Sequence, residues 1–283
     1  MTVQRFYQLS SGYRLPSVGL GTWSIPNAST AKVVCSALDC GFRLIDTAVL
    51  YGNERECGQG ILKWIEQDPQ NNKREEVVYT TKLWNSECGY ARAKAAIKKC
   101  FEKVEGLGYI DLLLIHSPLA GPTARLETWK AMQEAVDEGL VKSIGVSNYG
   151  QHHIEQLLSW EGLRYKPVVN QIEISPWLMR QELADFCKSN GIVVEAYAPL
   201  AHGGRINDKD VSRLAKKYNV STAQILIRWS LQKGYVPLPK TKSLERLPSN
   251  IDVYNFEISQ EDMDILSHPE SYDPTDWECT DAP

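Results

Sequence analysis

The chain has 283 residues, of which 43% are hydrophobic and 23% are charged, and its formal net charge at pH 7 is −4. This composition is that of an ordinary globular protein, and one α/β barrel accommodates a chain of this length, so we expect residues 1–283 to form one domain. The net charge and the lack of Lys/Arg runs argue against nucleic acid as a partner, and no segment has the apolar length needed to span a membrane.

Short β-rich segments alternate with amphipathic helical segments, which predicts parallel strands joined by crossover helices. Residues 1–12 contain no apolar stretch of signal-peptide length. Residues 6–16 predict a small hairpin with Ser11 and Gly12 in its turn. Several of the later strand segments are nearly continuous apolar runs, as expected for strands covered on both faces. The eight predicted strands are residues 18–21, 42–46, 77–83, 111–116, 143–148, 168–174, 192–198 and 235–240.

Helical patterns fill the intervals between these strands. The first begins at Thr30, a capping residue, and ends at Gly41. Eight strands with interposed helices are the count of a closed (β/α)8 TIM barrel of the α/β class, here with the N-terminal hairpin and a short C-terminal tail. The alternative is an open doubly wound sheet, which usually has fewer strands and a glycine-rich first turn. The other predicted helices are residues 91–104, 125–139, 155–160, 181–191, 210–220 and 223–234.

The cysteines are odd in number, scattered, and without a CxxC pair. This distribution is typical of reduced thiols in a cytoplasmic protein and argues against a disulfide framework or a zinc site. We expect most of them to be small core residues. The seven are Cys35, Cys40, Cys57, Cys88, Cys100, Cys187 and Cys279.

A polar or aromatic side chain closes nearly every predicted strand. In a closed barrel the C-terminal strand ends converge on one mouth, where the active site lies. Any one of these residues alone is most simply interpreted as solvated, but a whole ring of them indicates a binding site. The ring consists of Asp46, Lys82, His116, Ser147, Asn148, Gln171, Tyr197 and Lys240.

Within this ring, four residues form a coherent set for delivering a proton. Tyr51 follows Asp46 by five residues, on the loop after the second strand. A free tyrosine, with a pKa of ~10, is a reluctant acid at neutral pH. A buried Lys82 ammonium is expected to lower that pKa, and Asp46 to keep the lysine charged and in place. His116 supplies a second donor for a carbonyl oxygen.

Seven short motifs occur in order along the chain, and they cover nearly all of it. They are GLGTW at 19–23, DTAVLYGNE at 46–54, TTKLW at 80–84, DLLLIHSP at 111–118, GVSN at 145–148, NQIE at 170–173 and LPKTKSLERLPSN at 238–250. Together they resemble the aldo-keto reductase family, and in particular its small fungal members of the glycerol dehydrogenase, xylose reductase and conjugated polyketone reductase types. The resemblance implies an NADPH-dependent enzyme that reduces aldehydes or ketones to alcohols.

The resemblance also implies roles for the matching residues. Tyr51 corresponds to the general acid, Asp46 and Lys82 to its tuning partners, and His116 to the residue that orients the carbonyl. A further group corresponds to residues that hold the nicotinamide half of the cofactor, with Tyr197 stacked on its ring. This group is Gly21, Thr22, Ser147, Asn148, Gln171, Tyr197 and Leu200.

The segment after the eighth strand places three cations and two hydroxyls within seven residues. Alone, such a cluster is usually a solvated surface. The resemblance implies that it binds the 2′-phosphate of NADPH, with Lys240 and Arg246 as phosphate ligands and Asn250 as an adenine contact. Ser249 stands where the family often has glutamate. The cluster is Lys240, Thr241, Lys242, Ser243 and Arg246.

Several other motifs are missing from the sequence. The glycines of GLGTW lack the third glycine of a Rossmann fingerprint, and there is no P-loop, HExxH, GxSxG or His/Cys grouping at metal spacing, so we expect no metal. His152 and His153 are adjacent and are expected to point in different directions on a helix surface.

Two alternative functions remain open at this point. Some proteins of this fold are cofactor-sensing, channel-associated subunits with little turnover; that interpretation expects an appended regulatory tail, whereas this chain starts at its barrel hairpin. A metal-dependent barrel hydrolase needs His or carboxylate ligands at several strand ends, and Lys82 and Lys240 argue against it.

The substrate is expected to be a small carbonyl compound, and the protein a monomer. Trp23 and Trp84 supply flat apolar walls, and Trp277 offers a lid in the tail. Ser117 stands where many family members carry an aromatic residue, which predicts a wider and more polar pocket with room for bulky ketones.

The loop after the seventh strand, residues 201–210, is short and contains Gly203 and Gly204. Glycine loses much entropy on ordering, so we expect a flexible cover over the cofactor and rapid cofactor release. Arg205 is expected to be solvated there.

Overall fold

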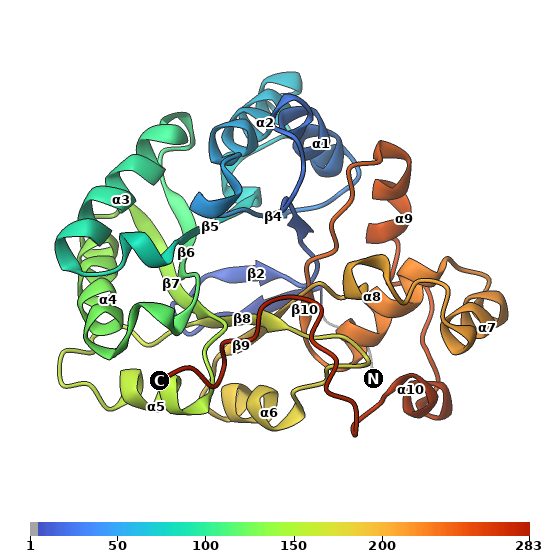
Figure 1. Ribbon diagram of the computed structural model, residues 1–283. Helices are drawn as coiled ribbons and strands as arrows, with labels where there is room; N and C mark the ends of the chain where they lie inside the picture. The colour runs from blue at the N-terminus through green and yellow to red at the C-terminus, as the bar shows by residue number, and fades with distance from the viewer. Residues whose placement is uncertain (1–4) are drawn as a thin grey trace.

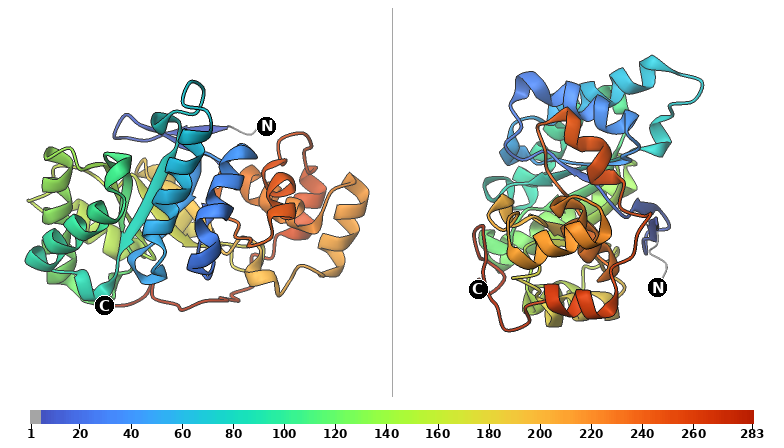
Figure 2. Two further views of the ribbon diagram at one scale, coloured as in Figure 1. Left: turned by 90° about the horizontal axis from the view of Figure 1, so that it is seen from above. Right: turned by 90° about the vertical axis from the view of Figure 1, so that its right-hand side faces the viewer.

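The computed structural model describes residues 5–283 and shows a closed barrel with a hairpin at one end. Residues 1–4, which begin the segment searched for a signal peptide, lie outside the described residues. The predicted hairpin is confirmed: β1 (Phe6–Gln8) pairs antiparallel with β2 (Arg14–Pro16), and Gly12 takes a positive φ of 88° in the turn. Figure 2 shows this hairpin at one end of the barrel and the C-terminal tail at the other.

Eight parallel strands form the barrel in the order of the sequence (Figure 1). Backbone hydrogen bonds from Gly19 to Pro237 and from Gly21 to Pro239, both 3.1 Å, join the first strand region to the last. Within residues 5–283 this closure leaves the eight-stranded sheet without a free edge, so the prediction of a barrel over an open sheet is confirmed. The strands are β3 (Leu20–Gly21), β4 (Leu44–Asp46), β5 (Val78–Leu83), β6 (Ile110–Ile115), β7 (Val141–Ser147), β8 (Val169–Glu173), β9 (Val193–Tyr197) and β10 (Val236–Pro237).

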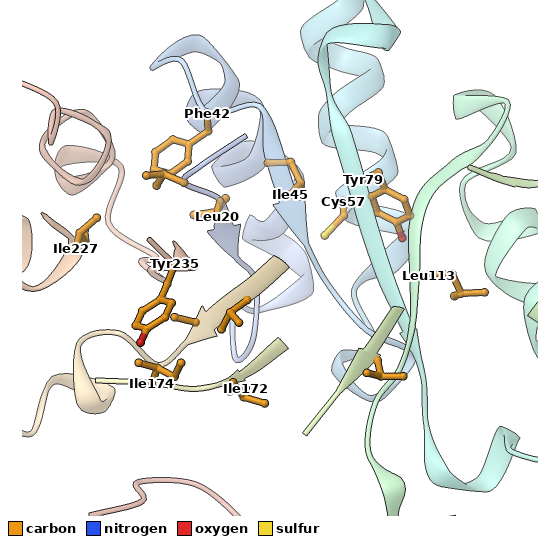
Figure 3. Close-up of a cluster of buried hydrophobic side chains, with 14 of the residues drawn as sticks. Leu20, Phe42, Ile45, Cys57, Tyr79, Leu113, Ile172, Ile174, Ile227 and Tyr235 are labelled. Carbon is orange, nitrogen blue, oxygen red and sulfur yellow. The ribbon is translucent and has the colours of Figure 1, made fainter. Parts of the chain in front are cut away.

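The continuous apolar runs reflect two separate cores. In β6, Leu112 and Leu114 face the barrel interior, where they join Leu15 of the hairpin. Leu113 belongs to the outer core between strands and helices, part of which Figure 3 shows. Because side chains alternate along a strand, a strand covered on both faces is apolar at successive positions.

Ten α-helices lie among residues 5–283, and the predicted starts at residues 30, 125 and 155 are three or four residues too late. The first helix begins at Asn27, not at Thr30; the Thr30 hydroxyl lies within its first turn and donates to the carbonyls of Ile25 and Pro26. The helices are α1 (Asn27–Asp39), α2 (Glu54–Gln67), α3 (Tyr90–Lys103), α4 (Pro122–Asp137), α5 (Gln151–Leu158), α6 (Gln181–Ser189), α7 (Lys209–Tyr218), α8 (Thr222–Gln232), α9 (Leu247–Ile251) and α10 (Gln260–Leu266).

Helix α2 lies outside the predicted helices, as do α9 and α10. Gly58 and Gly60 lower the helical propensity of α2, yet both are needed for its packing. A Cβ on Gly60 would lie 2.7 Å from the Ala31 carbonyl oxygen, and one on Gly58 would lie 2.9 Å from Val104. The close approach of α2 to its neighbours therefore selects glycine against local propensity.

The prediction that the adjacent histidines are surface residues holds for His152, which is exposed, but is wrong for His153. His153 is buried, and its Nδ1 accepts a hydrogen bond from the Gly150 amide. The Nε2 atoms of His152 and His153 both contact the Ala282 carbonyl oxygen, so the two rings point to the same place. They anchor the end of the tail.

The prediction that most cysteines are small core residues is confirmed. All seven are free thiols, and all except Cys40 are buried. No helix within residues 5–283 has both the length and the apolar character required to cross a bilayer.

Candidate active site

The polar strand ends meet at one cavity of about 880 Å³, at the barrel end opposite the hairpin. This volume is in the range of small-molecule sites. Thr22, Lys82 and Ser117 lie behind the lining and are fully buried. The predicted residues that line the cavity are Gly21, Trp23, Asp46, Tyr51, Trp84, His116, Ser147, Asn148, Gln171, Tyr197, Leu200, Lys240, Thr241, Arg246, Asn250 and Trp277.

A buried ion pair lies beneath Tyr51. Lys82 Nζ, on β5, is 2.8 Å from the carboxylate of Asp46, on β4, and donates to the Thr47 carbonyl oxygen at 2.8 Å. The Thr22 hydroxyl donates to the Asp46 carbonyl oxygen at 2.8 Å, which fixes the end of β4. Tyr51 lies on the short 3-10 helix Val49–Tyr51, with its hydroxyl 3.4 Å from Lys82 Nζ.

We expected Lys82 to lower the pKa of Tyr51, but the surroundings of Tyr51 raise it. Burial raises the pKa of Tyr51 well above its ordinary value, and the negative charges of Asp46 and Asp276 raise it further. Lys82 favours the phenolate but does not reverse this rise, because Asp46 offsets part of its charge at close range. Tyr51 is therefore a phenol that holds its proton firmly.

His116 is a neutral imidazole at the same end of the cavity. Burial, and then the charge of Lys82, lowers its pKa well below the ordinary value. Its Nδ1 is buried and has no hydrogen-bond partner within residues 5–283. The ring packs edge-on against Trp84 at 5.0 Å and Tyr51 at 5.7 Å between centroids. A neutral imidazole carries one donor and one acceptor nitrogen.

Hydrogen bonds also tie together the residues matched to the nicotinamide half. The Ser147 hydroxyl donates to the Gln171 carbonyl oxygen at 2.8 Å, and Asn148 Nδ2 donates to the His116 carbonyl oxygen at 3.1 Å. Asn148 has a positive φ of 60°, a conformation that asparagine tolerates better than most residues. The Tyr197 hydroxyl donates to Asn148 Oδ1 at 2.9 Å, so this tyrosine is held at the cavity wall.

The far end of the cavity is cationic. The loop after β10 brings Lys240, Lys242 and Arg246 to the cavity, and all three are exposed. Thr241 is buried, and its hydroxyl accepts from the Ser243 amide at 3.1 Å. One continuous cavity thus has amides and hydroxyls at one end and, at the other, cations that form no ion pair within residues 5–283.

The expectation that Ser117 widens the pocket is wrong. Its hydroxyl is buried, donates to Asn85 Oδ1 at 2.6 Å and accepts from the Leu119 amide at 3.3 Å. Ser117 therefore begins the short 3-10 helix Pro118–Ala120 instead of lining the cavity. The space beside His116 is filled by aromatic rings, since Trp277 lies 5.3 Å from Trp84 between ring centroids.

The loop after β9 is not a free cover, contrary to the expectation. Its first residues form the 3-10 helix Ala201–Gly203, and two ion pairs join it to the C-terminal tail. Arg205 pairs with Asp273, and His202 Nε2 lies 3.6 Å from Asp276. His202 and Asp276 both line the cavity and were not among the predicted site residues.

Hydrogen bonds and ion pairs attach the C-terminal tail to the barrel at several points, and Figure 1 shows the tail crossing the barrel mouth. Buried Glu173, at the end of β8, accepts from the amides of Thr275 and Asp276. Arg180 pairs with Glu278, whose pKa falls to about 2 because hydrogen bonds from its neighbours outweigh its burial. The acidic residues spaced along the tail were the sequence signal for its ion pairs with Arg180, His202 and Arg205.

Comparisons with known proteins agree with this geometry. The aldo/keto reductase family model matches residues 17–268, so the tail after α10 lies beyond the matched range. An uncharacterized oxidoreductase of Saccharomyces cerevisiae is 63% identical over 281 residues, covering 99% of this chain and 100% of the yeast protein. Glyoxal reductase of Bacillus subtilis is 40% identical over 260 residues, covering 92% and 90%. A solved structure of an aldo-keto reductase enzyme from a Medee basin deep-sea metagenome library has a TM-score of 0.88 at 36% identity, covering 98% and 99%.

Proposed function

Because the chain belongs to the aldo-keto reductase family of oxidoreductases, we propose that it is an NADPH-dependent enzyme that reduces aldehydes and ketones to alcohols. The observation that carries the proposal is the arrangement of Tyr51 over the buried Asp46–Lys82 pair, with His116 beside it. These four groups supply a proton donor, a charge to stabilise its conjugate base, and a second polar contact for a carbonyl oxygen.

The residues at both ends of the cavity support the proposal that the cofactor is NADPH. Ser147, Asn148 and Gln171 present polar groups beside Tyr51, while Lys240 and Arg246 suit the 2′-phosphate that distinguishes NADPH from NADH. When bound, NADPH supplies the hydride that reaches the carbonyl carbon.

The protonation states of Tyr51, Lys82 and His116 indicate how a proton would reach the carbonyl oxygen. A substrate oxygen that gained negative charge as an alkoxide would be a stronger base than a phenolate, so Tyr51 would give up its proton to it despite its raised pKa. Lys82 then stabilises the phenolate at 3.4 Å, and solvent returns the proton. Neutral His116 is able to donate a ring N–H to the same oxygen without competing as an acid.

The walls of the cavity favour flat or apolar carbonyl substrates. Trp23 lies 4.9 Å from Tyr51 between ring centroids, and Trp84 and Trp277 cover His116. Aromatic walls also exclude water from the reacting atoms, which strengthens the electrostatic contacts there.

The test is an assay of NADPH oxidation with a panel of aromatic aldehydes, aldoses, α-keto esters and α-dicarbonyls, including glyoxal. Tyr51→Phe keeps the ring and removes the proton, so we expect kcat to fall by about two to four orders of magnitude. The NADPH dissociation constant, measured by protein fluorescence, should change little. Near wild-type turnover in Tyr51→Phe would contradict the assignment of the general acid.

The same assay addresses the alternative of a cofactor-sensing subunit. Tight NADPH binding without turnover of any carbonyl in the panel would favour that function over the reductase. Turnover that disappears in Tyr51→Phe would exclude it.

A further inference from the structure

Glu195 is a buried acid in the barrel interior that the proposed mechanism does not use. It lies on β9 and is fully buried, directly beneath the cavity. Its Oε2 accepts a hydrogen bond of 2.8 Å from Gln171 Nε2. Its other oxygen, Oε1, has no hydrogen-bond partner within residues 5–283. A buried polar atom without a hydrogen-bond partner lowers the stability of the folded protein, and an apolar residue at this position would avoid that loss.

Gln171 is held between two acids. The same Nε2 atom that donates to Glu195 also donates to Asp46 Oδ1 at 2.9 Å. An amide nitrogen carries two hydrogens, so both are used beneath the cavity. Gln171 lines the cavity, and no hydrogen bond within the described chain reaches its Oε1. The carbonyl oxygen is therefore the part of this amide that is free to contact a ligand.

The two acids together fix which end of the amide points into the barrel. If the amide turned over, its oxygen would face the Asp46 carboxylate, which cannot donate, and at least one contact would become repulsive. Burial, and then the charge of Asp46, raises the pKa of Glu195 to about 8. The protonated acid still accepts through its carbonyl oxygen, and it adds no second negative charge beside Asp46.

We propose that Glu195 is a positioning residue that, with Asp46, holds the Gln171 amide with its oxygen toward the cavity, where it accepts a hydrogen bond from the carboxamide N–H of a nicotinamide cofactor. The inference rests on the proposed function, because it assumes that a nicotinamide binds at this end of the cavity. Glu195 thus contributes to cofactor recognition through Gln171 and does not itself touch the cofactor.

The experiment compares two ligands that differ in this one group. NADP⁺ carries a carboxamide, whereas 3-acetylpyridine adenine dinucleotide phosphate carries an acetyl group, which has the oxygen but no N–H. The dissociation constants of both are measured by protein fluorescence, and their ratio reports the hydrogen bond to Gln171. A general loss of packing would weaken both ligands alike and leave the ratio unchanged.

Glu195→Met removes, at similar volume, one of the two acceptors that hold the Gln171 amide, so the amide is held by Asp46 alone and its orientation is less fixed. We expect wild type to prefer NADP⁺, and the variant to lose about 2- to 10-fold of that preference. Glu195→Gln, which keeps a carbonyl oxygen for Gln171, should restore most of it. If Glu195→Met does not fold, Glu195→Thr suits a strand and is too short to reach Gln171. Asp262→Asn changes a buried carboxylate on α10 and serves as the matched control.

The outcomes separate this inference from the proposed function. An unchanged ratio in folded Glu195→Met or Glu195→Thr would overturn the positioning role while leaving the reductase intact. A wild-type protein that binds neither dinucleotide would overturn the proposed function and the positioning role together.

Discussion

The floor and the rim of the cavity both contain ion pairs, but the surroundings of these pairs differ. In the floor, the side chains of Lys82 and Asp46 are 0% and 5% exposed. In the rim, those of His202 and Asp276 are 43% and 37% exposed, and the neighbouring pair of Arg205 and Asp273 is similar. Removing one partner of a buried pair is costly, whereas exposed pairs contribute little. The floor is therefore suited to hold catalytic groups in place, and the rim to open and close.

The most severe test of this comparison is to break the pair in the floor. Lys82→Met leaves Asp46 buried without its cation, so we expect the free energy of unfolding in urea to fall by about 3–5 kcal/mol, together with most of the reductase activity. Lys94→Met, which removes a lysine from an exposed pair with Glu134, is the matched control and should hardly change the unfolding curve. Equal losses in the two variants would show that burial does not distinguish these pairs.

A second test concerns the cationic end of the rim. Arg246 is exposed and forms no ion pair within residues 5–283, so its charge is available to a ligand. Arg246→Ala should weaken NADPH binding by about tenfold or more and leave NADH binding nearly unchanged. Arg213→Ala, on the surface of α7, controls for the loss of a positive charge. A similar loss for both cofactors would show that Arg246 does not contact the 2′-phosphate.

The smallest expected effect is a pH dependence of cofactor release. The Asp276 carboxylate, 3.6 Å from His202 Nε2, raises the pKa of His202, so this one of the two contacts between loop and tail is fully formed below about pH 6.5 and is lost as pH rises through the raised value. Stopped-flow fluorescence should show a second, slower phase of NADPH binding, and cofactor release should be at most about fivefold faster at pH 8 than at pH 6.

Two variants identify the cause of this pH dependence. His202→Gln should abolish it because the titrating group is gone. Asp276→Asn should also abolish it if the ion pair is responsible. A pH dependence that persists in Asp276→Asn would assign the effect to attraction between His202 and the cofactor phosphates instead.

Local sequence patterns were misleading where packing overrides them. Helix α2 was not predicted because Gly58 and Gly60 lower its helical propensity. The contacts that require glycine there come from Val104 and Ala31, which lie in other segments. Ser117 follows His116 in the sequence, yet its side chain turns away from the cavity toward Asn85. Neither outcome is visible in a pattern confined to one segment.

The sequence by itself determined the order of the strands and the polar residues at or near their C-terminal ends, because hydrophobic periodicity is a local property. Once the strands form a closed barrel, the ring from Asp46 to Lys240 necessarily meets at one mouth. Only the tertiary structure decided which members of that ring touch. Gln171 reaches Asp46 across 125 positions of sequence, and Arg205 reaches Asp273 across 68. These contacts depend on closure of the barrel and on the path of the tail across it, and both are set by packing between distant segments.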